Sequence, residues 1–169
     1  MSYISRSDLA KSPGARELAQ VATPEQEAVV DADLMQASLT GADRSAWSAD
    51  EIAVADQALA VIDAAVVDAD AVIDGYLAPR GYLPLDPVPG IVTTWARAIT
   101  RYQLHKDRVG GEKDDPIVRA YRDALALLQQ TAAGKFSLGL GDTTAPAGTG
   151  SPDWSAPARQ FTNDSLQDF

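Results

Sequence analysis

This chain of 169 residues contains one histidine and no cysteine, which narrows the chemistry it can perform. His105 is the only candidate base for a Ser-His-Asp triad. A metal site with two histidine ligands cannot be built, and thiolate ligands, cysteine nucleophiles and disulfides are excluded. His105 falls near the end of a predicted helix, where an imidazole more often interacts with the negative pole of the helix dipole. Catalysis by His105 is therefore the weaker interpretation.

Four aspartates recur on one face of a predicted helix: Asp56, Asp63, Asp70 and Asp74. Paired carboxylates can hold a divalent cation or transfer protons. Residues seven apart lie two turns, about 10 Å, from each other along a helix axis, which is far for shared coordination. A solvated acidic face is therefore the favoured interpretation, and a metal site is the alternative.

Three arginines, Arg97, Arg101 and Arg108, share the face of a later helix that points away from Trp95. Such a row can contact phosphate, which keeps a nucleic-acid-binding regulator as an alternative. The formal net charge of -10 disfavours it, because phosphate repels an acidic protein. Pairing with an acidic face, such as the aspartates of an adjacent copy, is favoured because charge pairs set register and partner choice.

The charges are unevenly distributed along the chain. Residues 1–87 hold 5 Lys/Arg against 15 Asp/Glu, whereas residues 88–135 hold 8 against 5. An acidic first half and a mildly basic second half can attract each other, within one chain or between copies.

To lie on one face, the four aspartates must belong to one long helix. Ser48 and Glu51 form a capping box that begins this helix, and we predict that it runs to about Leu77. Its main apolar stripe consists of Leu59, Ile62, Val66, Ile73 and Leu77, and a second ridge consists of Val54, Val61 and Val72. A helix that is apolar on two sides is expected to be buried on two sides. In a chain this small, we expect the second contact to come from another subunit.

Two more long helices follow. Pro89 suits the first turn of a helix that runs to about Lys106. Asp115 as the N-cap and Pro116 at the first position begin another, which ends near Gly134. Their predicted core stripes are Ile91, Trp95, Ile99 and Tyr102 on the first, and Ile117, Tyr121, Leu125 and Leu128 on the second.

The remaining segments complete a helical domain over residues 1–140. Residues 3–30 predict two short helices, and residues 31–46 are interpreted as a loop or insertion. Strand signals are weak. The sequence therefore predicts an all-α bundle with three long helices, short N-terminal helices and an extended C-terminal tail.

Residues 141–169 change in composition to a linker rich in threonine, proline and glycine. Large apolar side chains then return at Trp154, Phe161, Leu166 and Phe169. A disordered tail has little use for them, so we expect the tail to dock on a partner or neighbouring subunit, with an inert tail as the alternative. The polar N-terminus and the lack of a run of about 20 apolar residues predict a soluble protein made in a cytoplasm.

The connector DGYLAPRGYLPLDPVP, residues 74–89, is long and apolar for a link between helices. Its prolines predict a stiff path that loses little entropy on ordering. We interpret it as a rigid corner, with Arg80 and Tyr82 as its best candidates for contacting a neighbouring subunit.

The order of residues from this connector onward resembles the Mu-like phage head–tail connector proteins, also described as neck, adaptor or head-completion proteins. The match spans about residues 3–140 and departs from the family pattern at residues 31–46 and at Gly81, which separates Arg80 from Tyr82. The residues that carry it include Ile73, Asp74, Tyr76, Leu77, Arg80, Tyr82, Leu83, Pro84, Leu85, Pro89, Ala98, Arg101, Tyr102, Leu104, Tyr121, Leu128, Gly134, Lys135 and Leu138.

The resemblance implies a structural protein of the virion, with no cofactor and no enzymatic activity. It implies a ring, expected to be a dodecamer, under the portal protein at the head–tail junction, after synthesis in the host cytoplasm. The ring would contact the next neck or tail-terminator protein, and genomic DNA would pass through it without sequence-specific binding. A stopper that seals the head is the alternative, and a small hydrolase or metal-dependent enzyme is the alternative from another class.

Overall fold

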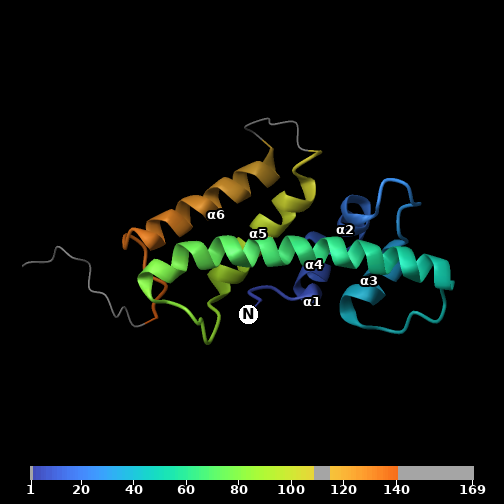
Figure 1. Cartoon of the computed structure of the whole chain (residues 1–169), viewed down its shortest axis with the longest axis horizontal. Helices are drawn as coiled ribbons and strands as arrows, with labels where there is room; N and C mark the ends of the chain where they lie inside the picture. The colour runs from blue at the N-terminus through green and yellow to red at the C-terminus, as the bar shows by residue number, and fades with distance from the viewer. Residues whose placement is uncertain (1, 109–114, 141–169) are drawn as a thin grey trace, which may run out of the picture.

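The computed structural model describes residues 2–108 and 115–140, and its regular elements there are all helical (Figure 1). In chain order they are α1 (Arg6–Leu9), the turn η1 (Ala10–Gly14), α2 (Ala15–Ala22), α3 (Ala32–Thr40), α4 (Ala49–Leu77), the short 3-10 turn η2 (Ala78–Arg80), α5 (Gly90–His105) and α6 (Pro116–Ala132). The predicted all-α fold with three long helices is confirmed.

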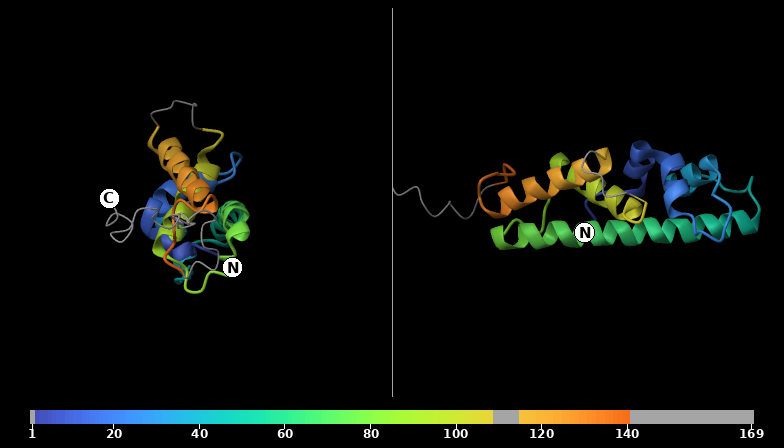
Figure 2. Two further views of the ribbon diagram at one scale, coloured as in Figure 1. Left: turned by 90° about the vertical axis from the view of Figure 1, so that its left-hand side faces the viewer. Right: turned by 90° about the horizontal axis from the view of Figure 1, so that it is seen from above.

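Helix α4 runs along the whole length of the body, and the other helices pack along one side of it (Figures 1 and 2). Its first turn is fixed by the predicted capping box: the Ser48 hydroxyl accepts from the backbone N–H of Glu51, and the Glu51 carboxylate accepts from that of Ser48. The predicted end at Leu77 is also confirmed. Helices α2 and α3 lie near the N-terminal end of α4, and α5 and α6 lie toward its C-terminal end.

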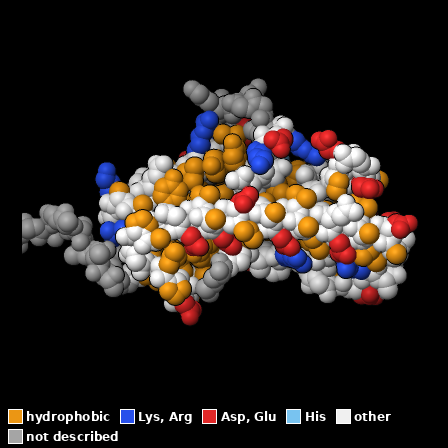
Figure 3. All heavy atoms as spheres, in the orientation of Figure 1, with side chains coloured by type: hydrophobic (Ala, Val, Ile, Leu, Met, Phe, Trp, Pro, Cys, Tyr) orange, Lys and Arg blue, Asp and Glu red, His pale blue; other side chains and the backbone are white. Residues whose placement is uncertain are grey.

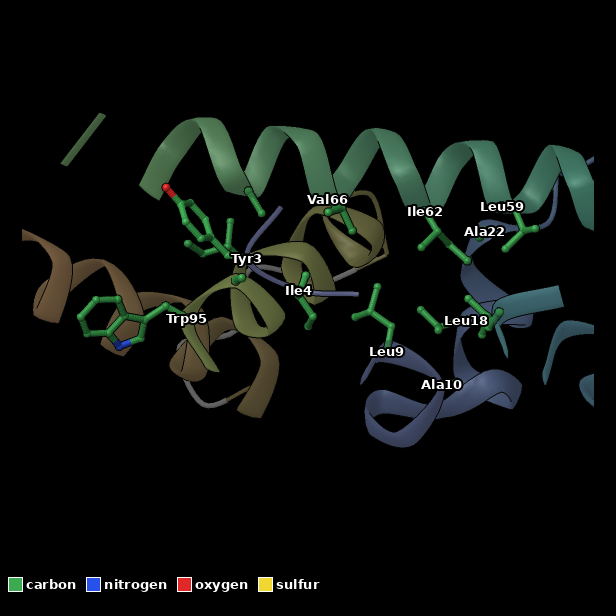
Figure 4. Close-up of a cluster of buried hydrophobic side chains, with 14 of the residues drawn as sticks. Tyr3, Ile4, Leu9, Ala10, Leu18, Ala22, Leu59, Ile62, Val66 and Trp95 are labelled. Atoms are coloured by element: carbon green, nitrogen blue, oxygen red, sulfur yellow. The ribbon is translucent and has the colours of Figure 1, made fainter. Parts of the chain in front are cut away.

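One hydrophobic core follows the inner side of α4. Its largest fully buried side chains include Leu9, Leu18, Leu34, Met35, Ile62, Ile73, Leu77, Leu85, Val92, Ile99 and Leu128. Figure 4 shows the N-terminal residues Tyr3, Ile4 and Leu9 lying beneath α4. Each such side chain contributes roughly 1.5–3 kcal/mol on burial, so the first residues of the chain are part of the core.

Residues 31–46 correct the sequence interpretation, because they contain helix α3 rather than a loop. Asp31 caps the helix by accepting from the backbone N–H groups of Asp33 and Leu34, and Gly41 ends it with φ of 70°. Leu34, Met35 and Leu39 are 1%, 0% and 3% exposed. The helix has only nine residues, so its apolar stripe barely repeats along the sequence.

Helices α5 and α6 begin as predicted, and their predicted core stripes are confirmed in part. Trp95, Ile99 and Leu128 are buried, whereas the other predicted stripe residues are only partly buried. Asp115 caps α6 by accepting from the N–H of Ile117, with Pro116 in the first turn, and Pro89 is the N-cap of α5. The buried residues are Val92, Trp95, Ala96, Ile99 and Thr100 on α5, and Val118, Ala124, Leu128 and Thr131 on α6. Small Ala96 and Ala124 thus occupy the interior, and helices approach closely where such side chains meet.

The two tyrosines predicted for these stripes lie at the rim of the core, whereas Trp95 is 2% exposed. Tyr102 of α5 and Tyr121 of α6 are partly buried, and their rings stack with centroids 4.0 Å apart. Burial raises the pKa of Tyr121, with smaller contributions from Tyr102 and Tyr76. The pair therefore joins α5 to α6 at the edge of the core rather than inside it.

The second apolar ridge predicted on α4 is only partly covered by the described residues. Val54 and Val72 are partly buried, whereas Val61 is 44% exposed. Val67, on the same outer side, is 65% exposed. The two-sided burial expected from the sequence is therefore incomplete within the described part of this chain.

Several predictions concern residues outside the described ranges. The proposed linker and tail, 141–169, with Trp154, Phe161, Leu166 and Phe169, lie there, so their docking stays a prediction. Within residues 2–108 and 115–140, no helix combines the length and apolar character needed to cross a bilayer.

Candidate interaction surfaces

The first two aspartates of the predicted acidic row bind arginines from other elements of the same chain. Arg6 of α1 donates from Nε to Asp63 Oδ1 at 2.8 Å and from Nη2 to the other carboxylate oxygen. Arg44, in the link between α3 and α4, donates from Nη1 to Asp56 Oδ1 at 2.5 Å. Both ion pairs are partly exposed, so they add little to the free energy of folding. Their main effect is to position α1 and the α3–α4 link against α4.

The last two aspartates hold Tyr3. The backbone N–H of Tyr3 donates to Asp70 Oδ1 at 3.1 Å, and its phenol O–H donates to Asp74 Oδ1. Tyr3 is 5% exposed. Burial, and then the hydrogen bond to Asp74, raise the pKa of the phenol above its ordinary value, so it remains a donor at neutral pH.

The acidic row on α4 therefore anchors the N-terminal segment and the α3–α4 link, which corrects the interpretation as a simply solvated face. The alternative of a metal site has no structural support: the described residues contain no group of three or more candidate ligands placed to hold an ion. Pairing of Asp56, Asp63 and Asp70 with another copy stays a prediction, and in this chain each of the three already has at least one partner.

Replacing Asp70 by asparagine is expected to raise the melting temperature at pH 7, because burial is the main cause that raises the pKa of Asp70. A raised carboxyl pKa means that the folded chain binds its proton more readily, so the stability cost is present at neutral pH and vanishes as the pH falls through that pKa. Asparagine keeps an oxygen for the Tyr3 N–H. Thermal melts should therefore show a stabilisation that shrinks toward pH 4, and a constant difference would contradict this origin.

The predicted arginine row of α5 also finds partners within the chain. Arg101 donates from Nε and Nη2 to both carboxylate oxygens of Glu17 on α2, at 2.5 and 2.8 Å. Arg108 donates from Nη1 to the carbonyl oxygen of Gln20 at 2.7 Å. These contacts fasten the C-terminal end of α5 to α2. Reversing Arg101 to glutamate would therefore break a contact inside the fold before it tested any contact between copies.

Arg97 and His105 complete this region. The Nε of Arg97 is buried and makes no hydrogen bond within the described residues. His105 has Nδ1 2.8 Å from the Arg101 carbonyl oxygen and Nε2 3.4 Å from Glu17 Oε1. Nδ1 thus faces a backbone carbonyl of its own helix and Nε2 faces α2, which assigns His105 a structural position.

The connector between α4 and α5 closes one end of the core. Tyr82 is 8% exposed and Leu85 is 1% exposed. The Arg80 guanidinium lies 5.8 Å from the centre of the Tyr82 ring and packs on Gly134, where an added Cβ would lie 2.9 Å from Arg80 Nη1. Arg80 and Tyr82 thus join the connector to the segment after α6. Their contact with a neighbouring subunit stays a prediction.

An acidic groove lies at the opposite end of the molecule, with a volume of about 390 Å³. Apolar side chains line it, including Val29, which is 60% exposed. Its carboxylates are Glu27, Asp31, Asp50 and Glu51, of which Asp31 and Glu51 are engaged as helix caps. The groove contains no histidine, lysine or arginine among its lining residues, so its polar chemistry is that of carboxylates alone.

Comparison with known proteins shows which family of proteins this chain resembles. A family described as "Bacteriophage Mu, Gp36" matches residues 3–154. "Mu-like prophage FluMu protein gp36" of Haemophilus influenzae is 37% identical over 83 residues, which cover 49% of this chain and 56% of that protein. "Gene product J" of Escherichia phage Mu is 36% identical over 91 residues, which cover 54% and 62%. No solved structure matches.

The chain is thus a protein of Mu-like bacteriophages, of the structural or assembly class. It belongs to the Bacteriophage Mu, Gp36 family. The chain spans less than two thirds of the length of both relatives described above.

Proposed function

We propose that this protein is a head–tail connector, an adaptor that forms a ring under the portal protein, completes the DNA-filled head and gives the tail its attachment surface. The observation that carries the proposal is the incomplete covering of α4. A helix of 29 residues leaves Val61 and Val67 on its outer side in water, as expected for a subunit of an assembly. The ring, its dodecameric stoichiometry and the location at the head–tail junction are parts of this proposal.

The overall charge of the chain is compatible with a ring through which DNA passes. Its formal net charge is -10. Carboxylates near a DNA path repel phosphate and disfavour binding, so the genome would pass without being held. The portal protein and the next neck or tail-terminator protein are the proposed partners above and below the ring.

Depletion of the protein during phage growth tests this function. We expect lysates with complete heads and complete tails that have not joined, seen by negative-stain electron microscopy, and a large loss of infectious particles. Expression of the unmodified chain from a plasmid is the control and should restore joined virions. Joined virions in the depleted lysate would overturn the proposal. Missing tails beside normal heads would also overturn it, because they would indicate a role in tail assembly.

A further inference from the structure

The outer face of α4 has a composition unlike that of a solvated helix. Its exposed positions between residues 53 and 75 are Ala53, Asp56, Gln57, Ala60, Val61, Ala64, Val67, Asp68, Ala71 and Gly75. A surface helix ordinarily places charged and polar side chains on this side. In Figure 3 most acidic side chains near α4 follow its lower edge, and the side chains that stand out on the face between its edges are hydrophobic. We call the positions Ala60, Val61, Ala64, Val67 and Ala71 the α4 outer face.

A second α4 is a poor occupant for this face. Asp68 lies beside this face and α4 has no Lys or Arg to pair with it, so two copies of α4 packed together would bring carboxylates close to each other without a cation. Like charges across an interface cost several kcal/mol and suppress such a pairing. The occupant must therefore present a different and more basic surface.

The basic surface of the described chain lies on α5 and α6. Residues 90–108 and 115–140 together hold seven Lys or Arg and three Asp or Glu. Two of these arginines, Arg101 and Arg108, are engaged with α2. Helix α6 also exposes a face directed away from α4 and α5. Its exposed positions include Arg119, Arg122, Asp123, Ala126, Gln129 and Gln130, which we call the α6 outer face.

We infer that the α4 outer face of one copy packs against the α6 outer face of the next copy. Alanines on both faces, including Ala64 and Ala126, leave room for two helices to approach to about 8–10 Å. Asp68, the carboxylate beside the α4 outer face, then faces a surface that carries Arg122. The contact removes Val61 and Val67 from water and matches an acidic helix with a basic one.

The two faces belong to different helices, so the contact is heterologous, and each copy keeps one free face for a further copy. Such a contact closes into a ring when the rotation between neighbours is suitable. The inference deepens the proposed function, because it rests on the proposed ring and names the surfaces that would join its subunits.

Two substitutions at exposed alanines test the contact: Ala64→Arg blocks the α4 outer face and Ala126→Arg blocks the α6 outer face. Arginine is nearly as good a helix former as alanine, so both chains should keep the far-ultraviolet circular dichroism of the unmodified chain. Sedimentation velocity should show oligomers for the unmodified chain and a monomer for each variant. An equimolar mixture of the two variants should form a one-to-one heterodimer, because each retains the face that the other lacks. Gln36→Arg, on the exposed side of α3, is the matched control and should assemble normally.

Each other outcome overturns the inference. An Ala64→Arg chain that assembles like the unmodified chain removes the α4 outer face from the interface. An Ala126→Arg chain that dimerises alone shows that α4 pairs with another α4. An unmodified chain that stays monomeric at millimolar concentration shows that no such contact forms. These results are independent of the depletion test, which would refute the connector role if virions stayed joined, even with the contact intact.

Discussion

Truncating Met35 to alanine is expected to lower the free energy of unfolding by about 2–5 kcal/mol, because a fully buried Met or Leu side chain leaves a cavity when it is cut back. Met35 is 0% exposed and belongs to the core cluster. Urea unfolding followed by circular dichroism measures the change. Gln36→Ala, at the next position and exposed, is the matched control and should change stability by no more than about 0.5 kcal/mol.

The same experiment decides between the two descriptions of residues 31–46. An inserted loop would tolerate both substitutions equally, because its side chains would contribute little to the core. A Met35→Ala chain as stable as the Gln36→Ala chain would therefore contradict the burial of α3. A large difference between them would show that this segment is a structural part of the domain.

Signals for α3 were present in the sequence but were short. Asp31 is a good N-cap and Gly41 a good terminator, and both act in these roles. Between them the large apolar residues are only the adjacent pair Leu34-Met35 and then Leu39, and nine residues span fewer than three turns. Periodicity over such a length does not distinguish a helix from a polar loop. The capping residues were the better guide.

The long helices were predictable because local chemistry fixes their ends. The capping box at Ser48 and the Asp115-Pro116 pair each satisfy backbone groups within one turn, so neighbouring residues suffice to place them. The face that each helix buries depends instead on its neighbours in space. On α6 the interior received Val118 and Ala124, and the larger Tyr121 moved to the rim.

The partners of the charged residues were not predictable from the sequence. Arg6 and Asp63 are 57 residues apart, and Arg101 and Glu17 are 84 apart. The spacing of the aspartates correctly placed them on one side of a helix. It carried no information on Tyr3 or Arg44, which reach that side from other elements. Opposite charges distant in sequence meet only once the fold is known.

The two-sided pattern of α4 proved informative in a different way. The core covers only one side of α4, and the apolar side chains Val61 and Val67 on the other side stay exposed. These exposed apolar side chains mark a surface of α4 that the described part of the chain does not cover. The apolar pattern of the sequence thereby supports the proposed assembly, and no catalytic residue enters the argument.

Truncating Tyr3 to alanine is expected to lower the free energy of unfolding by about 3–5 kcal/mol, the range for removing a large buried aromatic side chain. Tyr3→Phe keeps the ring and removes only the hydroxyl that donates to Asp74, so it should cost about 1–2 kcal/mol. Urea unfolding of both variants separates the contribution of packing from that of the hydrogen bond. Arg16→Ala, an exposed position on α2, serves as the control and should remain within about 0.5 kcal/mol of the unmodified chain.

The comparison of these two variants also decides what the acidic row of α4 does. If Tyr3→Ala costs much more than Tyr3→Phe, the N-terminal segment is packed on α4, and Asp70 and Asp74 are engaged inside the chain. If the two variants cost equally little, the segment is not held there. Both carboxylates would then be available to basic side chains of a neighbouring copy, the arrangement that the sequence first suggested for this row.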